Sequence, residues 1–139
     1  MSTLQSFNAR TGEAFGAAVP ANTTAELHAA IEKADAAFDQ WQATDGAQRA
    51  SFLNALATAL EQDREKLVEL ADTETGLGLP RLNGELDRTA FQLRRFATIA
   101  QSGGAFAFTD DPAVAGAPPA GHPAMMRVRV PLGPVAMFS

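Results

Sequence analysis

The chain has 139 residues, with 11 basic and 16 acidic side chains and a formal net charge of −5. This acidic balance argues against a nucleic-acid binder that depends on bulk positive charge. Hydrophobic residues make up 46% of the chain and charged residues 19%, which is typical of one globular domain and not of a disordered segment. There is no cysteine, so disulfides, thiolate zinc sites and a cysteine nucleophile are excluded for these residues. The two histidines, His28 and His122, lie far apart and indicate no metal site.

Signals for secretion and membrane insertion are not recognised in the sequence. Residues 1–10 combine neither a basic leader nor the apolar run of a signal peptide, and nowhere do about 18 apolar residues follow one another. We therefore expect a cytoplasmic protein with neither a membrane nor a nucleic acid as partner.

The beginning of the chain predicts two strands and a helix. The stretch 7–19 has the pattern of two short strands on either side of a glycine turn at 11–13. A helix should follow over about 24–41, because Thr23 and Glu26 have the spacing of a capping box. Its apolar side chains recur at helical spacing, namely Leu27, Ile31, Ala34, Phe38 and Trp41.

Three more helical segments are predicted before residue 103. Asp45 is placed to cap the second, and Asp63 starts a fresh helical turn. That third segment should end at Gly76, since glycine readily takes the left-handed conformation common at helix ends. The last helix should cover about 81–102 and end at the glycine pair 103–104.

The composition changes after residue 109, where six of the eight prolines fall. Residues 115–123 predict a structureless connection. Residues 105–108 and 126–130 alternate in side-chain type, which predicts two strands. Residues 135–139 are apolar without alternation, as is typical of a strand buried on both faces of a parallel sheet.

This last segment predicts that the chain is part of a larger protein. A strand buried on both faces needs neighbouring strands and crossover helices, each of a dozen or more residues, and none follow Ser139. The alternative is a short edge strand at the C-terminus.

One face of the last predicted helix is suited to an anion. Gly84, Arg88 and Gln92 are spaced i, i+4, i+8 and so share a helical face. Glycine permits close approach, and arginine offers two parallel N–H donors to a carboxylate. The alternative is that Arg88 pairs with Glu85 or another surface acid.

No catalytic or metal-binding residue is assigned from the sequence. The stretch 76–78 (Gly-Leu-Gly) lacks the third glycine of a dinucleotide-binding loop and follows a predicted helix instead of a strand. No serine lies in a nucleophile elbow, and no catalytic triad is recognised.

Five stretches in the same order resemble the N-terminal segment of the NAD(P)-dependent aldehyde dehydrogenases. They are residues 7–13 (FNARTGE), 36–41 (AAFDQW), Arg49, 74–76 (ETG) and 131–139 (PLGPVAMFS). Within this family, residues 74–77, 84–89 and 92–94 look most like the α-ketoglutarate semialdehyde (2,5-dioxopentanoate) dehydrogenases.

The resemblance implies an α/β fold. This chain would be its α-rich N-terminal part, with short β-strands and the first strand of a Rossmann-type sheet. Residues 1–102 would belong to the cofactor-binding domain, 103–130 to a β-arm and proline-rich connection used in oligomerisation, and 131–139 to the start of the sheet. Phe138 and Ser139 would then lie at the cofactor site.

The resemblance also implies an activity, the oxidation of a semialdehyde to an acid with NAD or NADP by a homo-oligomeric enzyme. Gly84, Arg88 and Gln92 would line the mouth of the aldehyde tunnel, and the catalytic asparagine, cysteine and glutamate would lie beyond Ser139. We therefore expect the chain by itself to be inactive and to bind no cofactor. The alternative function is a non-catalytic helical interaction module that adds residues 132–138 as a strand to a partner's sheet.

Overall fold

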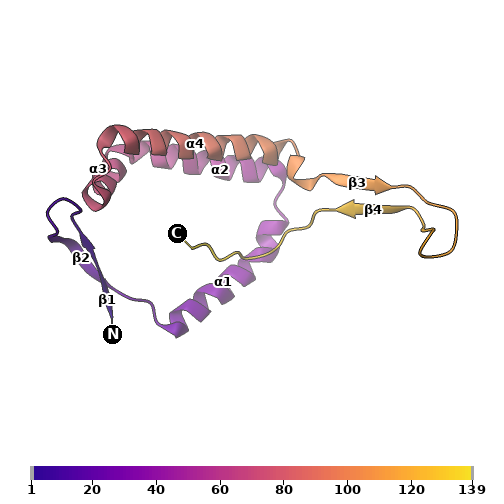
Figure 1. Cartoon of the computed structure of the whole chain (residues 1–139), viewed down its shortest axis with the longest axis horizontal. Helices are drawn as coiled ribbons and strands as arrows, with labels where there is room; N and C mark the ends of the chain where they lie inside the picture. The colour runs from indigo at the N-terminus through magenta and orange to yellow at the C-terminus, as the bar shows by residue number, and fades with distance from the viewer. Residues whose placement is uncertain (1, 139) are drawn as a thin grey trace.

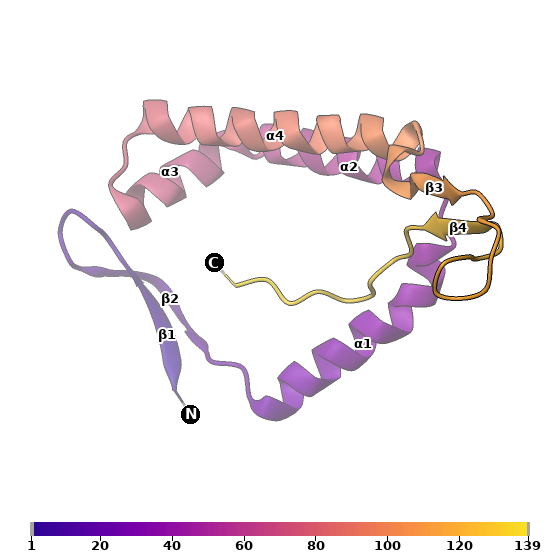
Figure 2. The ribbon, with the colours of Figure 1, turned by 45° about the vertical axis from the view of Figure 1, so that its right-hand side comes forward.

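In the computed structural model, which describes residues 2–138, the chain forms four α-helices, one short 3-10 helix and four short strands. In chain order they are β1 (Thr3–Phe7), β2 (Ala14–Pro20), α1 (Thr24–Gln42), α2 (Gly46–Gln62), α3 (Arg64–Thr75), α4 (Leu79–Gln101), η1 (Gly104–Phe106), β3 (Phe108–Asp111) and β4 (Met125–Val128). Figure 1 shows α2 and α4 side by side, with α1 leaving them at an angle. In Figures 1 and 2 the C-terminal segment runs between α1 and the other helices.

The helix starts follow the predicted caps. The side-chain oxygen of Thr23 accepts from the amide of Glu26, and Glu26 accepts from the amide of Thr23 at 2.7 Å. Asp45 and Gln48 exchange the same pair of bonds at the start of α2, at 2.7 and 2.9 Å. Because these side chains satisfy amides that have no partner within the helix, each helix begins at a defined residue.

The packed core lies between α2 and α4, with a contribution from α3. Its buried side chains are mostly small: Ala50, Ala57, Val68, Leu86, Ala90 and Ala97. Small residues let the two helix backbones approach closely, and a Cβ at Gly46 would collide with the carbonyl oxygen of Ala100. The tight α2–α4 pair therefore depends on residues without bulk at the contact.

The hairpin of β1 and β2 is attached to the end of α3. The amide of Ala9 donates to the carbonyl of Thr73 at 2.9 Å. Arg10 forms an ion pair with Asp72 at 2.9 Å, and Asp72 also accepts from the amide of Gly78 at 2.8 Å. Asp72 therefore joins the hairpin turn to the connection between α3 and α4.

The helices and the second strand of the first hairpin confirm the predicted elements, and Gly76 ends α3 at a φ of 68° as expected. The first strand of that hairpin lies earlier than predicted, because β1 ends at Phe7, where the predicted strand begins. The strand predicted at 105–108 is wrong. Gly103 is left-handed, and the amide of Phe106 donates to its carbonyl, so the chain makes a 3-10 turn before β3 begins. The predicted second strand, 126–130, is shifted and shortened to β4, which pairs antiparallel with β3.

Residues 115–123 contain neither helix nor strand, as predicted, and backbone hydrogen bonds of 2.9 and 3.0 Å between Val114 and His122 close this loop. One other prediction for the C-terminal part is wrong. Residues 135–138 form no strand, because no strand within residues 2–138 pairs with them. Ser139, the end of that prediction, lies outside the described residues.

Across residues 2–138, no helix combines the length and the apolar character that crossing a bilayer requires.

Candidate functional site

The predicted anion site lies on the outer face of α4. Leu86, Ala90 and Ala97 are buried against the other helices, and this fixes the rotation of α4 about its axis. Gly84, Arg88 and Gln92 are placed on the opposite side by the 3.6-residue period, and all three are exposed. The structure thus brings the three predicted residues together on one accessible face.

Arg88 has a partner within its own helix. Its Nε and Nη2 atoms donate to the same oxygen, Oε2 of Glu85, at 3.0 and 2.8 Å. The two side chains remain 65% and 47% exposed, so the pair lies at the surface and not in the core. The alternative considered for Arg88, an ion pair with Glu85, is therefore present in the structure.

The site still has donors and space for an anion. A guanidinium carries five N–H groups, and Glu85 engages only one side of it, so Nη1 and the second N–H of Nη2 remain available. Within 4 Å of a Cβ built on Gly84 there is no atom other than its own helix and immediate neighbours. The free edge of Arg88, the open backbone at Gly84 and the side chain of Gln92 thus belong to one exposed face of α4.

Other arginines of the helical layer are engaged in ion pairs between helices. Arg94 donates to both carboxylate oxygens of Glu61 at 2.8 and 2.6 Å, and these hydrogen bonds lower the pKa of Glu61. Arg64 binds Asp87 of α4. These pairs join α4 to α2 and α3, whereas Arg88 and Glu85 belong to the same helix and hold no other element.

The cofactor role expected of Phe138 and Ser139 stays a prediction. Phe138 is 94% exposed, and Ser139 lies outside the described residues. Residues 76–78 join α3 to α4, and so they do not form the strand-to-helix loop that holds a pyrophosphate. In residues 2–138, no three His, Asp or Glu side chains gather as a metal site requires.

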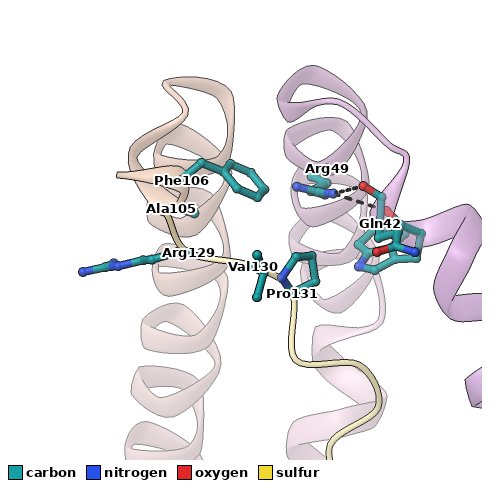
Figure 3. Close-up of a pocket in the computed structure, with 8 residues that line it drawn as sticks. Gln42, Arg49, Ala105, Phe106, Arg129, Val130 and Pro131 are labelled. Carbon is teal, nitrogen blue, oxygen red and sulfur yellow. Dashed lines mark hydrogen bonds between the residues drawn. The ribbon is translucent and has the colours of Figure 1, made fainter. Parts of the chain in front are cut away.

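A cavity of about 320 Å³ lies where α1, α2 and η1 meet. Arg49 is one of the residues that line it, and its Nη2 donates to the carbonyls of Trp41 and Gln42 at 3.3 and 2.9 Å (Figure 3). Its guanidinium also lies 5.1 Å from the ring centre of Phe106, whereas Arg129 points away from the cavity. Because the guanidinium of Arg49 is engaged by Thr44, by two carbonyls of α1 and by Phe106, this cavity is a junction between elements and not an anion site.

Sequence reasoning assigned Arg49 no contact. The position of Arg49 could have predicted these contacts. It lies one turn into α2, just after the three-residue link from α1, so its long side chain can reach back to the carbonyls at the end of α1, which have no partner within the helix.

Comparison with known proteins assigns the chain to a family. The model of the "Aldehyde dehydrogenase family" matches residues 2–139. The chain belongs to the aldehyde dehydrogenase family. This confirms the resemblance on which the expected fold rests, because the match covers the whole described chain.

Two curated relatives are similar over nearly the full length. Alpha-ketoglutaric semialdehyde dehydrogenase 2 of Azospirillum brasilense is 38% identical over 137 residues, which are 98% of this chain and 26% of the relative. Alpha-ketoglutaric semialdehyde dehydrogenase of Acinetobacter baylyi is 35% identical, again over 98% of this chain and 26% of the relative. The chain therefore spans about a quarter of the length of these aldehyde dehydrogenases.

The fold is shared with a solved semialdehyde dehydrogenase as well. The crystal structure of succinate-semialdehyde dehydrogenase from Burkholderia pseudomallei matches 80% of this chain and 22% of that chain, with a TM-score of 0.71 and 29% identity. The crystal structure of PnpE in complex with nicotinamide adenine dinucleotide matches 83% of this chain and 23% of that chain, with a TM-score of 0.72 and 27% identity. The arrangement of helices and hairpins described above is thus part of an aldehyde dehydrogenase fold, as expected from the sequence.

Proposed function

We propose that this chain is part of an NAD(P)-dependent enzyme that oxidises α-ketoglutarate semialdehyde, or a similar semialdehyde with a carboxylate at its far end, to the acid. The names of the two curated relatives support the substrate class, and PnpE, solved with nicotinamide adenine dinucleotide, supports the cofactor class. The observation that carries the proposal within this chain is the exposed arginine on α4, beside a glycine that leaves room for a ligand.

Arg88 has the role of binding the distal carboxylate of the substrate. Its free guanidinium edge offers two parallel donors, Gly84 leaves the approach open, and Gln92 adds a carboxamide donor one turn further along. Binding at the distal end orients the aldehyde, which lies away from α4. In the overall reaction, water would supply the second oxygen of the acid, the aldehyde hydrogen would leave as a hydride to a nicotinamide cofactor bound elsewhere in the enzyme, and two protons would be released.

The reacting groups belong to other parts of the protein in this proposal. Covalent oxidation of an aldehyde needs a thiolate, and these 139 residues contain no cysteine. Phe138 would approach the cofactor only when residues 131–138 pair with strands from elsewhere in the enzyme. The chain thus contributes substrate recognition and scaffold. The family match over residues 2–139 favours this function over a non-catalytic interaction module.

The β3–β4 ribbon supports the homo-oligomer as part of the same proposal. The two strands pair only with each other, so each has one free edge, and Phe108, Met126 and Val128 are more than half exposed. A second copy of the enzyme would cover such an edge and its apolar side chains.

The substitution Arg88→Ala in the whole enzyme tests the substrate assignment. A charge-assisted bidentate contact is worth about 1.5–3 kcal/mol, so kcat/KM for the anionic semialdehyde should fall by about 10- to 150-fold. An uncharged aldehyde of similar length should be nearly unaffected, because it never binds the guanidinium. Steady-state kinetics on both substrates measures the difference.

Arg95→Ala is the matched control. Arg95 lies seven residues further along the same outer face and is exposed, so its removal takes away one positive charge without touching Arg88. Equal losses on both substrates, or no loss on either, would refute the role of Arg88.

A further inference from the structure

Glu85 already occupies part of the site that a substrate carboxylate would use. Both bonds of the pair end on the single oxygen Oε2, at 3.0 Å from Nε and 2.8 Å from Nη2 of Arg88. An incoming carboxylate must therefore replace this oxygen or bind the Nη1–Nη2 edge beside it. In both cases the negative charge of Glu85 opposes the charge of the ligand.

We propose that Glu85 is a specificity-determining residue, an internal competitor for Arg88 that weakens the binding of carboxylate substrates. The proposal rests on the function proposed for Arg88. With Glu85 ionised, the pair has no net charge, and the field that attracts an anion to this face of α4 is small. Uncharged aldehydes do not experience this competition, so Glu85 changes the preference between the two substrate classes.

A ligand carboxylate can replace Glu85 on Arg88 at a small energetic cost. Both side chains are largely exposed, and surface pairs of this kind are weak enough for a ligand to replace. Releasing Arg88 from Glu85 separates no helices, because the two residues are one turn apart in α4. The register of α4 is kept by Leu86 in the core and by the inter-helix pair of Arg94 with Glu61.

Of the other charges near Glu85, Asp87 is engaged, because it binds Arg64 of α3 and so does not take the place of Glu85 on Arg88. Arg81, four residues before Glu85 on α4, is exposed and belongs to none of the ion pairs of residues 2–138. The Glu85 side chain also borders an apolar cavity of about 210 Å³ between α2, α3 and α4, where no cation is present to hold it. A displaced Glu85 therefore turns to solvent or to Arg81, and its charge stays close to the bound ligand.

The substitution Glu85→Gln in the whole enzyme tests the proposal. We expect KM for the anionic semialdehyde to fall by about two- to five-fold, because a surface ion pair is weak and its removal can improve binding only modestly. We expect kcat to stay unchanged, because the contact lies far from the reacting carbon. KM for an uncharged aldehyde of similar length should not change. Raising the ionic strength should reduce the gain, because salt screens exposed charges.

Glu69→Gln is the matched control, since it removes one exposed carboxylate from α3 and leaves Arg88 and the inter-helix ion pairs of α4 untouched. Glu85→Ala, which also removes the hydrogen-bond acceptor, should give at least the gain of Glu85→Gln. In an Arg88→Ala background the gain should vanish.

Two different failures are distinguishable. If Arg88→Ala causes a selective loss but both Glu85 variants leave KM unchanged, or lower it equally for both substrates, the role of Glu85 is refuted and that of Arg88 stands. If Arg88→Ala causes no selective loss, the substrate assignment itself is refuted, and the proposal for Glu85 with it.

Discussion

At the scale of single residues, the chemistry of this chain depends on which acid each arginine meets. Arg10, Arg64 and Arg94 each meet an acid from a different element and so hold the fold together. Arg88 meets Glu85 within its own helix and holds nothing else. An arginine without a structural role between elements is free to bind a ligand, and this distinguishes Arg88 from Arg10, Arg64 and Arg94.

The ion pair of Arg10 and Asp72 predicts a pH-dependent stability. The hydrogen bond from Arg10 and then that from the amide of Gly78 hold the pKa of Asp72 below its ordinary 3.8. A carboxylate with a lowered pKa stabilises the folded state above its unfolded pKa, and the contribution is lost as pH falls through the folded value. We expect the attachment of the hairpin to α3 to weaken in that acidic range, while the backbone hydrogen bond from Ala9 to Thr73 is kept.

Asp72→Asn tests this expectation. The melting temperature of the variant should lie below that of the wild type at pH 7, and the difference should shrink as pH falls below 3.8. Asp35→Asn, on α1 and far from the hairpin, is the control and should track the wild type at every pH. A difference that stays constant across the pH range would contradict the role of Asp72.

At the scale of elements, α1 is joined to the helical layer mainly at its C-terminal end. None of its residues is buried, and its contacts gather around Arg49 and the edge-to-face pair of Trp41 and Phe52, whose ring centres lie 5.3 Å apart. Ala34 and Phe38 face Gly133 and Pro134 across a small cavity. The angle between α1 and α2 therefore depends on one guanidinium and one aromatic pair.

Arg49→Lys should loosen this junction. Lysine keeps the charge but cannot bond Thr44 and the carbonyls of Trp41 and Gln42 at once, so we expect a loss of about 1–3 kcal/mol in the free energy of unfolding. Denaturant unfolding measures the loss. Trp41, the one tryptophan of the chain, should become more accessible to a fluorescence quencher.

Arg95→Lys serves as the control for Arg49, because it makes the same chemical change on the exposed face of α4. Unchanged stability together with unchanged quenching in Arg49→Lys would show that Trp41 and Phe52 suffice to hold α1.

At the scale of the whole molecule, apolar surface is left uncovered. Leu132, Met137 and Phe138 are each more than 90% exposed, and the inner face of α1 also exposes Leu27 and Ile31. Apolar area of this size is normally covered by another element or another chain. The chain spans about a quarter of the length of its relatives, which is consistent with this apolar surface being buried by parts of the enzyme outside these residues.

The isolated 139-residue chain should therefore self-associate. Sedimentation velocity should show oligomers whose proportion rises with concentration, and deleting 131–139 or replacing Leu132, Met137 and Phe138 by serine should reduce them. The serine variant keeps the length of the chain, so it separates the effect of apolar surface from that of truncation. A monomer at high concentration that neither change affects would contradict the prediction.

Local patterns by themselves determined most of the helical part of this protein. The caps at Thr23 and Asp45 and the left-handed glycine at 76 act within one helical turn, so the sequence specifies them before any packing occurs. The same holds for the shared face of Gly84, Arg88 and Gln92, because helical spacing fixes it. The order of the motifs also identified the family.

Only the tertiary structure decided the features that need a distant partner. Phe106 lies in a 3-10 turn beneath Arg49 instead of a strand, and Val114 meets His122 across a loop that composition alone predicts to be structureless. Residues 135–138 have the composition of a buried strand, yet a strand exists only where another pairs with it. Propensity is a property of the segment, whereas pairing is a property of its neighbours.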